Sequence, residues 1–213
     1  MIRRQIVPGL VLLLAALLLA QPACAPQKDA AAPLNIIFLI GDGMSNSIVS
    51  AARIKKGGAT GTLNLDQMPV IGLVRTSSSS HLITDSAAAA TAMASGFKTY
   101  NGAIGVNAEG KKVLSILEAG ISRGMAAGLV ATSPITHATP ASFGSHVAKR
   151  SEGNRIAEGL LANKIDLLLG GGYGFFIPKA QDGSYRDDER DLLREARDAG
   201  YAVCRTREEL AAA

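Results

Sequence analysis

The sequence predicts an α/β protein in which a mostly parallel central sheet is covered by helices on both faces. Apolar runs typical of buried strands alternate along the chain with segments in which apolar residues recur at helical spacing. The first run, residues 34–40, shows no period-two alternation and ends at Asp42 between two glycines. Because such sheets bind ligands at the carboxyl ends of their strands, we expect Asp42 to lie at the functional edge.

The turn after this first run favours a cation over a dinucleotide. It begins like a dinucleotide fingerprint, but Asn46 stands where the third glycine belongs. The carboxylate of Asp42 would also repel a pyrophosphate, whereas it suits a metal ion.

Five apolar runs bounded by turn residues are the predicted strands. They are residues 34–40, 70–76, 126–132, 165–170 and 201–204.

The segments between these runs carry helical signals. Ser45 or Asn46 would cap a first helix, and Ser86 heads an alanine-rich helix that ends at Gly96. Pro140 is predicted to begin a helix that carries His146 and Arg150 at i, i+4 spacing. Further helices are indicated by apolar residues at 113–121, 156–161 and 192–196, the first and last of them stopping at Gly124 and Gly200.

A capping box stands close to the end of the chain. Thr206 and Glu209 form a T-x-x-E pattern that opens a helix, yet the sequence stops at Ala213. We therefore expect the chain to be truncated at its carboxyl end.

The first 25 residues have the pattern of a signal peptide. Arg3 and Arg4 precede an apolar run, residues 10–20, that is too short to span a bilayer and leads to Ala-Cys-Ala at 23–25. We expect a signal peptide at 1–25, a linker at 26–33 and the amino-terminal part of a larger domain at 34–213. The predicted location is periplasmic or secreted. Lipid attachment at Cys24, giving an envelope lipoprotein, is the alternative.

Charge and cysteine usage narrow the function classes. The chain has 22 basic and 18 acidic residues, and two of the basic residues belong to the leader. The rest of the sequence is therefore nearly balanced in charge and has no basic stripe of the kind that indicates nucleic-acid binding. Cys204 is the only cysteine besides Cys24, so no intramolecular disulfide is expected in the mature chain.

Three residues carry individually weak chemical signals. Ser86 at a helix head is typical of a plain N-cap, but the same helix terminus would also stabilise a phosphate, and a nearby cation would make the hydroxyl a nucleophile. His137 and Thr139 lie two residues apart, so in an extended segment both would face one ion.

Taken together, three segments resemble the alkaline phosphatase family of secreted, metal-dependent phosphomonoesterases. They are "IIFLIGDGM", "TDSAAAATAMASGFKTYNGAIGV" and "THATPASFGSHVAKR", in the family's order and approximate spacing. A fourth segment, "IDLLLGGGYGFF", extends the resemblance to about Phe176.

The resemblance implies a role for each candidate residue. Asp42 matches the carboxylate between a zinc and the magnesium position, and Ser86 matches the nucleophile that becomes phosphoserine and also coordinates zinc. His137 and Thr139 match the pair at the magnesium position, where family members carry Asp or His in the first place. Arg150 matches the arginine that binds two phosphate oxygens. The implied cofactors are Zn²⁺ and Mg²⁺, the substrates are small phosphate monoesters, and a homodimer is compatible with the family.

The resemblance covers the amino-terminal portion of a family member. Most zinc ligands of the family lie in the carboxyl-terminal half, so we expect this chain by itself to hold only part of the metal site. A non-catalytic remnant is therefore one alternative. A phosphodiesterase or sulfatase of the same superfamily is another, although T-D-S-A and T-H-A-T-P favour neither.

Overall fold

The computed structural model describes residues 35–213 and divides the chain into two compact units, Met1–Gly41 and Asp42–Ala213. The predicted signal peptide at 1–25 and linker at 26–33 lie outside the described residues. In the first unit, residues 35–41 are described and form no helix or strand. The second unit contains the sheet and all the candidate site residues.

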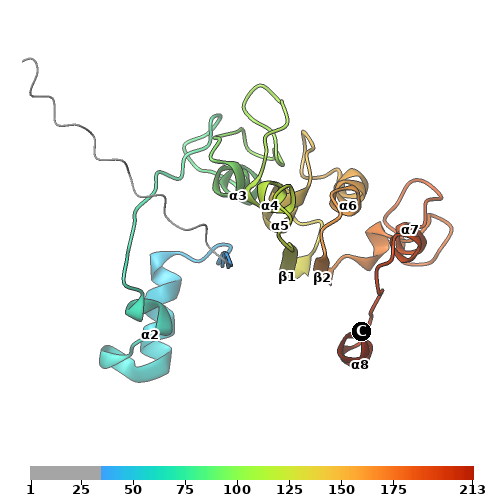
Figure 1. Cartoon of the computed structure of the whole chain (residues 1–213). Helices are drawn as coiled ribbons and strands as arrows, with labels where there is room; N and C mark the ends of the chain where they lie inside the picture. The colour runs from blue at the N-terminus through green and yellow to red at the C-terminus, as the bar shows by residue number, and fades with distance from the viewer. Residues whose placement is uncertain (1–34) are drawn as a thin grey trace, which may run out of the picture. The chain divides into compact units, whose positions relative to one another are not determined.

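Two parallel strands form the sheet of the second unit (Figure 1). β1, Gly128–Pro134, pairs with β2, Leu167–Gly171, in a register that places Leu129 opposite Leu168. These strands confirm the predicted runs at 126–132 and 165–170. The crossover between them contains two helices, as a parallel pair requires.

Helices are distributed along the second unit from its beginning to its end. Asp85 caps α3, Ser86–Ser95. Gly96 ends this helix in the left-handed conformation, as predicted. The other helices are α2 (Asn46–Gly57), α4 (Ile116–Ile121), α5 (Ala138–Gly144), α6 (Gly153–Ala162), α7 (Leu192–Asp198) and α8 (Arg207–Ala212), with 3₁₀ turns at Gly58–Thr60, Asn64–Gln67 and Tyr173–Phe175. Of the two candidate N-caps, Ser45 caps α2 and Asn46 is its first residue, and the predicted capping box at Thr206 and Glu209 is confirmed.

Three of the five predicted strands are wrong as secondary structure. Residues 70–76, 201–204 and the described part of 34–40 form no strand. A strand needs a neighbour for its backbone hydrogen bonds, yet Ile37 and Leu73 are 84% and 98% exposed. At 201–204 the backbone has another use, because the Tyr201 N–H donates to the Ala196 carbonyl in the Schellman motif that ends α7.

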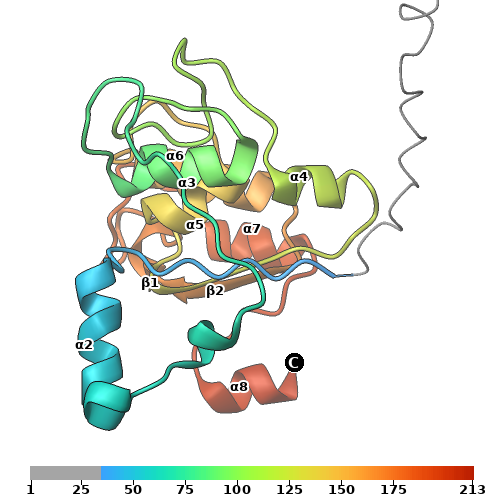
Figure 2. The ribbon, with the colours of Figure 1, turned by 90° about the vertical axis from the view of Figure 1, so that its left-hand side faces the viewer.

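α3 packs against α5 near the site (Figure 2). The core at this contact is built from small side chains. Ala87, Ala90 and Ala141 are fully or almost fully buried, which lets the two helices approach closely. Thr91 is also fully buried, and its hydroxyl lies 3.2 Å from Ser142 Oγ and accepts from the Gly105 N–H at 3.0 Å. This rigid contact fixes the amino-terminal turns of α3 and α5 relative to each other.

The predicted helix carrying His146 and Arg150 is wrong. α5 begins two residues before Pro140 and ends at Gly144, and Ser145 already has an extended backbone. The chain then pairs with an earlier loop, since Val147 bridges to Ile104 and the Arg150 N–H donates to the Gly102 carbonyl at 2.7 Å. These contacts, rather than a helix, place Arg150.

A buried arginine ties α6 to the segment that precedes α7. The Arg186 side chain is fully buried and donates to Glu158 Oε1 at 2.8 Å and to both carboxylate oxygens of Asp188 at 2.6 Å.

Within residues 35–213, no helix combines the length and apolar character needed to cross a bilayer.

Candidate active site

Ser86 is the first residue of α3, and its hydroxyl is not used to cap the helix. The carboxylate of Asp85 performs that function by accepting from the Ala88 N–H at 3.0 Å. Ser86 Oγ instead donates to Asp42 Oδ1 at 3.1 Å. The plain capping interpretation of Ser86 is therefore excluded, and its half-buried hydroxyl points into a cluster of polar side chains.

Asp42 lies at the centre of this cluster. Its Oδ1 accepts from Ser86, and its Oδ2 accepts from Thr139 Oγ1 at 2.9 Å. His137 Nδ1 lies 4.0 Å from the same Oδ2. The Asp42 side chain is 47% exposed, so the cluster opens to solvent.

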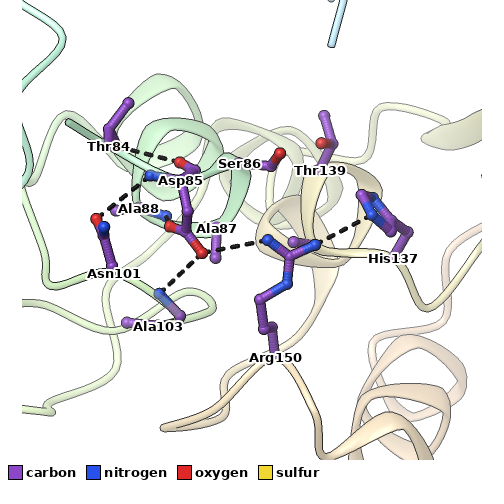
Figure 3. Close-up of polar contacts among 12 residues, drawn as sticks. Thr84, Asp85, Ser86, Ala87, Ala88, Asn101, Ala103, His137, Thr139 and Arg150 are labelled. Carbon is purple, nitrogen blue, oxygen red and sulfur yellow. Dashed lines mark hydrogen bonds and ion pairs between the residues drawn. The ribbon is translucent and has the colours of Figure 1, made fainter. Parts of the chain in front are cut away.

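His137 and Thr139 reach Asp42 by a different local structure from the one predicted. They are not two residues of an extended segment, because α5 begins between them with His137 as its N-cap. Thr139 lies in the first turn of the helix and His137 just before it. Both side chains still face the cluster because the start of α5 is held beside the start of α3 (Figure 3).

Arg150 forms the opposite side of the cluster (Figure 3). Its Nη1 donates to Asp85 Oδ2 at 3.2 Å, and its Nη2 lies 3.1 Å from His137 Nε2. The guanidinium is thus oriented by two partners from different elements. With its side chain 35% exposed, it also has access to a ligand.

Asp85 also belongs to this cluster, although its place in the sequence indicated no chemical role. Its Oδ2 accepts from both Arg150 and the Gly102 N–H, the latter at 3.0 Å. Burial alone would raise the pKa of Asp85, but hydrogen bonds from the Ala88 and Gly102 backbones and from Arg150 outweigh burial and lower that pKa. The signal in the sequence was Asp preceding Ser at a helix start, a pattern that also fits an ordinary cap.

Two neighbouring polar residues have supporting positions. Asn101 Oδ1 accepts from the Asp85 N–H at 3.3 Å, and Asn101 Nδ2 donates to the Ile83 carbonyl at 3.1 Å. Lys98, which lies in the same family-like segment as Ser86, donates to the Ser77 carbonyl at 2.7 Å. All five predicted site residues are brought together, whereas Lys98 is engaged with Ser77.

The family model of alkaline phosphatase matches residues 34–213, most of the chain. The chain belongs to the alkaline phosphatase family.

Curated relatives and solved structures agree with this membership. Alkaline phosphatase 4 of Bacillus subtilis is 40% identical over 202 residues, a match that covers 89% of this chain and 42% of the relative. The streptomycin-6-phosphate phosphatase of Streptomyces griseus is 36% identical, with 99% of this chain and 52% of the relative covered. The alkaline phosphatase of Thermus thermophilus superposes with a TM-score of 0.72 at 36% identity, over 81% of this chain and 36% of that one.

The chain therefore spans about half, or less, of the length of these curated relatives. The fold class predicted from the sequence, a parallel sheet flanked by helices, is that of the family. One structural neighbour is a histidine-to-aspartate variant of the alkaline phosphatase from the Antarctic bacterium TAB5, with Mg bound in its M3 site. It is 37% identical to this chain, with a TM-score of 0.64, and the match covers 74% of this chain and 44% of that one.

The donor atoms around Asp42 fit a hard cation such as Mg²⁺. Both carboxylate oxygens of Asp42 and the hydroxyls of Ser86 and Thr139 converge within hydrogen-bond distance, and oxygen ligands are what Mg²⁺ prefers. Among residues 35–213, no group of three or more His, Cys, Asp or Glu side chains could hold a metal. Since a catalytic zinc site needs three protein ligands, the described residues do not complete one.

Proposed function

We propose that this chain carries the nucleophile and the phosphate-binding part of a metal-dependent phosphomonoesterase site. The observation that carries the proposal is the convergence of Asp42, Ser86, Thr139 and Arg150 at one cluster, although they span more than a hundred residues of sequence. Helix caps and surface charges without a shared function would not be expected to converge at one cluster.

Ser86 acts as the nucleophile in this proposal. Its hydroxyl loses a proton as Oγ forms a bond to the phosphorus of a monoester, and the bond from phosphorus to the leaving oxygen breaks. The leaving alkoxide takes up a proton from solvent, and a phosphoserine remains. Water then breaks the bond between phosphorus and Oγ and releases phosphate. Ser86 is suited to this role because Asp85, not Ser86, satisfies the first turn of α3.

Arg150 binds the phosphate. Its planar guanidinium, held between Asp85 and His137, presents parallel N–H groups that match two phosphate oxygens. The N–H groups at the start of α3 add a favourable dipole for the same anion.

Asp42, Ser86, His137 and Thr139 would hold the metal ions. Mg²⁺ suits the oxygen donors of Asp42 and Thr139, whereas Asp42 and Ser86 would supply only part of the ligands that a Zn²⁺ needs. When bound, these cations supply positive charge that lowers the pKa of the serine hydroxyl and offsets charge on the phosphoryl group.

Trapping of the phosphoserine tests this function directly. The 213-residue chain would be incubated with Zn²⁺, Mg²⁺ and a chromogenic phosphate monoester, quenched in acid and digested for peptide mass mapping. We expect turnover above the metal-free sample and a phosphate on the peptide that contains Ser86. Phosphate on another residue would contradict the assignment of the nucleophile, and absence of both turnover and label would favour the non-catalytic alternative.

Export from the cytoplasm is a second proposal, and it rests on the sequence of residues 1–25. Expression in a bacterium with a periplasm should yield a mature chain that begins after Ala25, as measured by intact mass. A thioether-linked lipid on Cys24 would instead support an envelope lipoprotein. Recovery of the chain with Met1 retained in the cytoplasm would contradict both.

A homodimer, which the family resemblance allows, would be measured on the same sample by light scattering.

A further inference from the structure

His146 lies four residues before Arg150 in the sequence, in a cluster of side chains that the function described above does not use. Its Nδ1 is 2.6 Å from the Gly105 carbonyl oxygen, and its Nε2 is 2.7 Å from Glu118 Oε1. A carbonyl and an ionised carboxylate can only accept hydrogen bonds. Because a neutral imidazole has a single N–H, only the protonated ring donates to both partners.

The charges around His146 favour the same protonated form. The hydrogen bond to Glu118 raises the pKa of His146, whereas burial of the ring lowers that pKa. The Gly105 carbonyl raises the pKa further and Lys112 lowers it, and the net pKa of His146 is raised. Burial would raise the pKa of Glu118, but its hydrogen bonds from His146 and Ser115 outweigh burial and lower it. The side-chain amide of Asn163, the C-cap of α6, donates to Glu118 Oε1 at 3.1 Å, and Arg155 and Glu158 of α6 line the pocket beside the ring.

The loop that His146 contacts also supports Arg150. Val147 and Ile104 exchange two backbone hydrogen bonds of 3.0 Å, and the Arg150 N–H donates to the Gly102 carbonyl. The Gly102 N–H in turn donates to Asp85 Oδ2, the same oxygen that accepts from the Arg150 guanidinium. Residues 102–106 are therefore a common support for Arg150 and its carboxylate partner.

Gly105 permits this close approach. It has a φ of +57°, and a Cβ at this position would lie 2.2 Å from the Ser145 carbonyl oxygen and 2.7 Å from His146 Nδ1. No residue with a side chain fits there without moving the segment that leads to Arg150.

We propose that protonated His146 is a positioning residue for Arg150, because it ties the 145–150 segment to residues 102–106 and to α4 and so holds the guanidinium in place for phosphate. The proposal rests on the proposed role of Arg150. Its pH dependence follows from the raised pKa: the stabilising contribution is complete below the ordinary histidine value of 6.5 and is lost as pH rises through the higher value in the folded chain.

Nuclear magnetic resonance of the 213-residue chain tests the proposal without requiring activity. The His146 ring would be titrated with pH while the protection factors of the Val147 and Arg150 amides are measured by hydrogen exchange. We expect protection of both amides to fall about tenfold as the ring loses its proton, the size expected for one charge-assisted hydrogen bond. Amides of the β1–β2 ladder should not follow this titration.

Two variants separate positioning from general stability. Glu118→Gln should move the ring titration and the loss of protection to lower pH together, and His146→Gln should remove the pH-dependent step. Glu109→Gln removes a carboxylate from an exposed turn nearby and should change neither. Equal protection of Val147 and Arg150 in the wild type and in His146→Gln, or protection that ignores the ring titration in the wild type, would overturn the proposal.

Kinetics give an independent measurement if the chain hydrolyses a phosphate monoester. His146→Gln should then raise KM about tenfold with little change in kcat, because phosphate binding is weakened rather than the nucleophile removed. A fall in kcat with KM unchanged would contradict the positioning role. Lack of turnover in the wild type would count against the proposed function instead, and the exchange data would still decide the role of His146.

Discussion

Replacement of Ser86 with alanine is expected to lower phosphate-monoester turnover by about a thousandfold or more, the scale on which loss of a catalytic nucleophile acts. The hydroxyl would be gone, while Asp85 would still cap α3 and Asp42 would still bind Thr139. Folding should therefore be almost unaffected. The measurement is turnover of a chromogenic monoester by the Zn²⁺- and Mg²⁺-supplemented chain, with thermal unfolding recorded on the same samples.

Ser95→Ala is the matched control for Ser86→Ala. Ser95 lies at the other end of α3, where its hydroxyl donates to the Thr91 carbonyl at 2.7 Å, away from the cluster around Asp42. This variant should keep near-wild-type turnover. Full activity in Ser86→Ala would show that another group attacks phosphorus, and a large drop in unfolding temperature would show that the serine has a structural role.

Replacement of Arg150 with glutamine is expected to weaken binding of inorganic phosphate by roughly thirtyfold to a hundredfold, because two charge-assisted hydrogen bonds would be lost at a partly exposed site. Arg150→Lys keeps the positive charge but not the planar pair of N–H groups, so its loss should be smaller, on the order of tenfold. Phosphate would be measured as a competitive inhibitor of turnover and by calorimetry with the metal-supplemented chain.

Arg123→Gln is a suitable control for the change of charge. Arg123 is exposed just after α4, where Nη1 donates to the Ala119 carbonyl at 3.1 Å. Phosphate affinity should remain unchanged in this variant. An equal loss in Arg123→Gln and Arg150→Gln would indicate that net charge, rather than the position of Arg150, attracts the anion.

The sequence by itself determined the features that depend on local interactions. The sequence correctly predicted the cap at Thr206, Ser45 as one of two candidate caps, the glycine that ends α3 and the two apolar runs that became β1 and β2. Each of these depends on residues within a few positions of one another, or on continuous apolar character, which the sequence displays directly. The motifs around Asp42, Ser86 and Arg150 were specific enough to indicate the family as well.

Only the tertiary structure decided which hydroxyl or carboxylate performs which task. Both Asp85 and Ser86 could cap α3 by residue type, and the choice became visible only when Ser86 was found donating to Asp42. The helix expected through Arg150 does not form, because pairing of Val147 with Ile104 and of Arg150 with Gly102 holds that segment extended. Such contacts join residues more than forty positions apart, and local propensity carries no information about them.

The same reason explains the strand predictions that were wrong. Residues 70–76 have the apolar, β-branched composition of a strand, but a strand exists only where a neighbour completes its backbone hydrogen bonds, and Leu73 is 98% exposed. The role inferred for His146 was equally invisible in the sequence, where a histidine four residues before Arg150 indicated only a helical spacing. Its two acceptors, Gly105 and Glu118, come from separate segments that the fold brings to opposite sides of one ring.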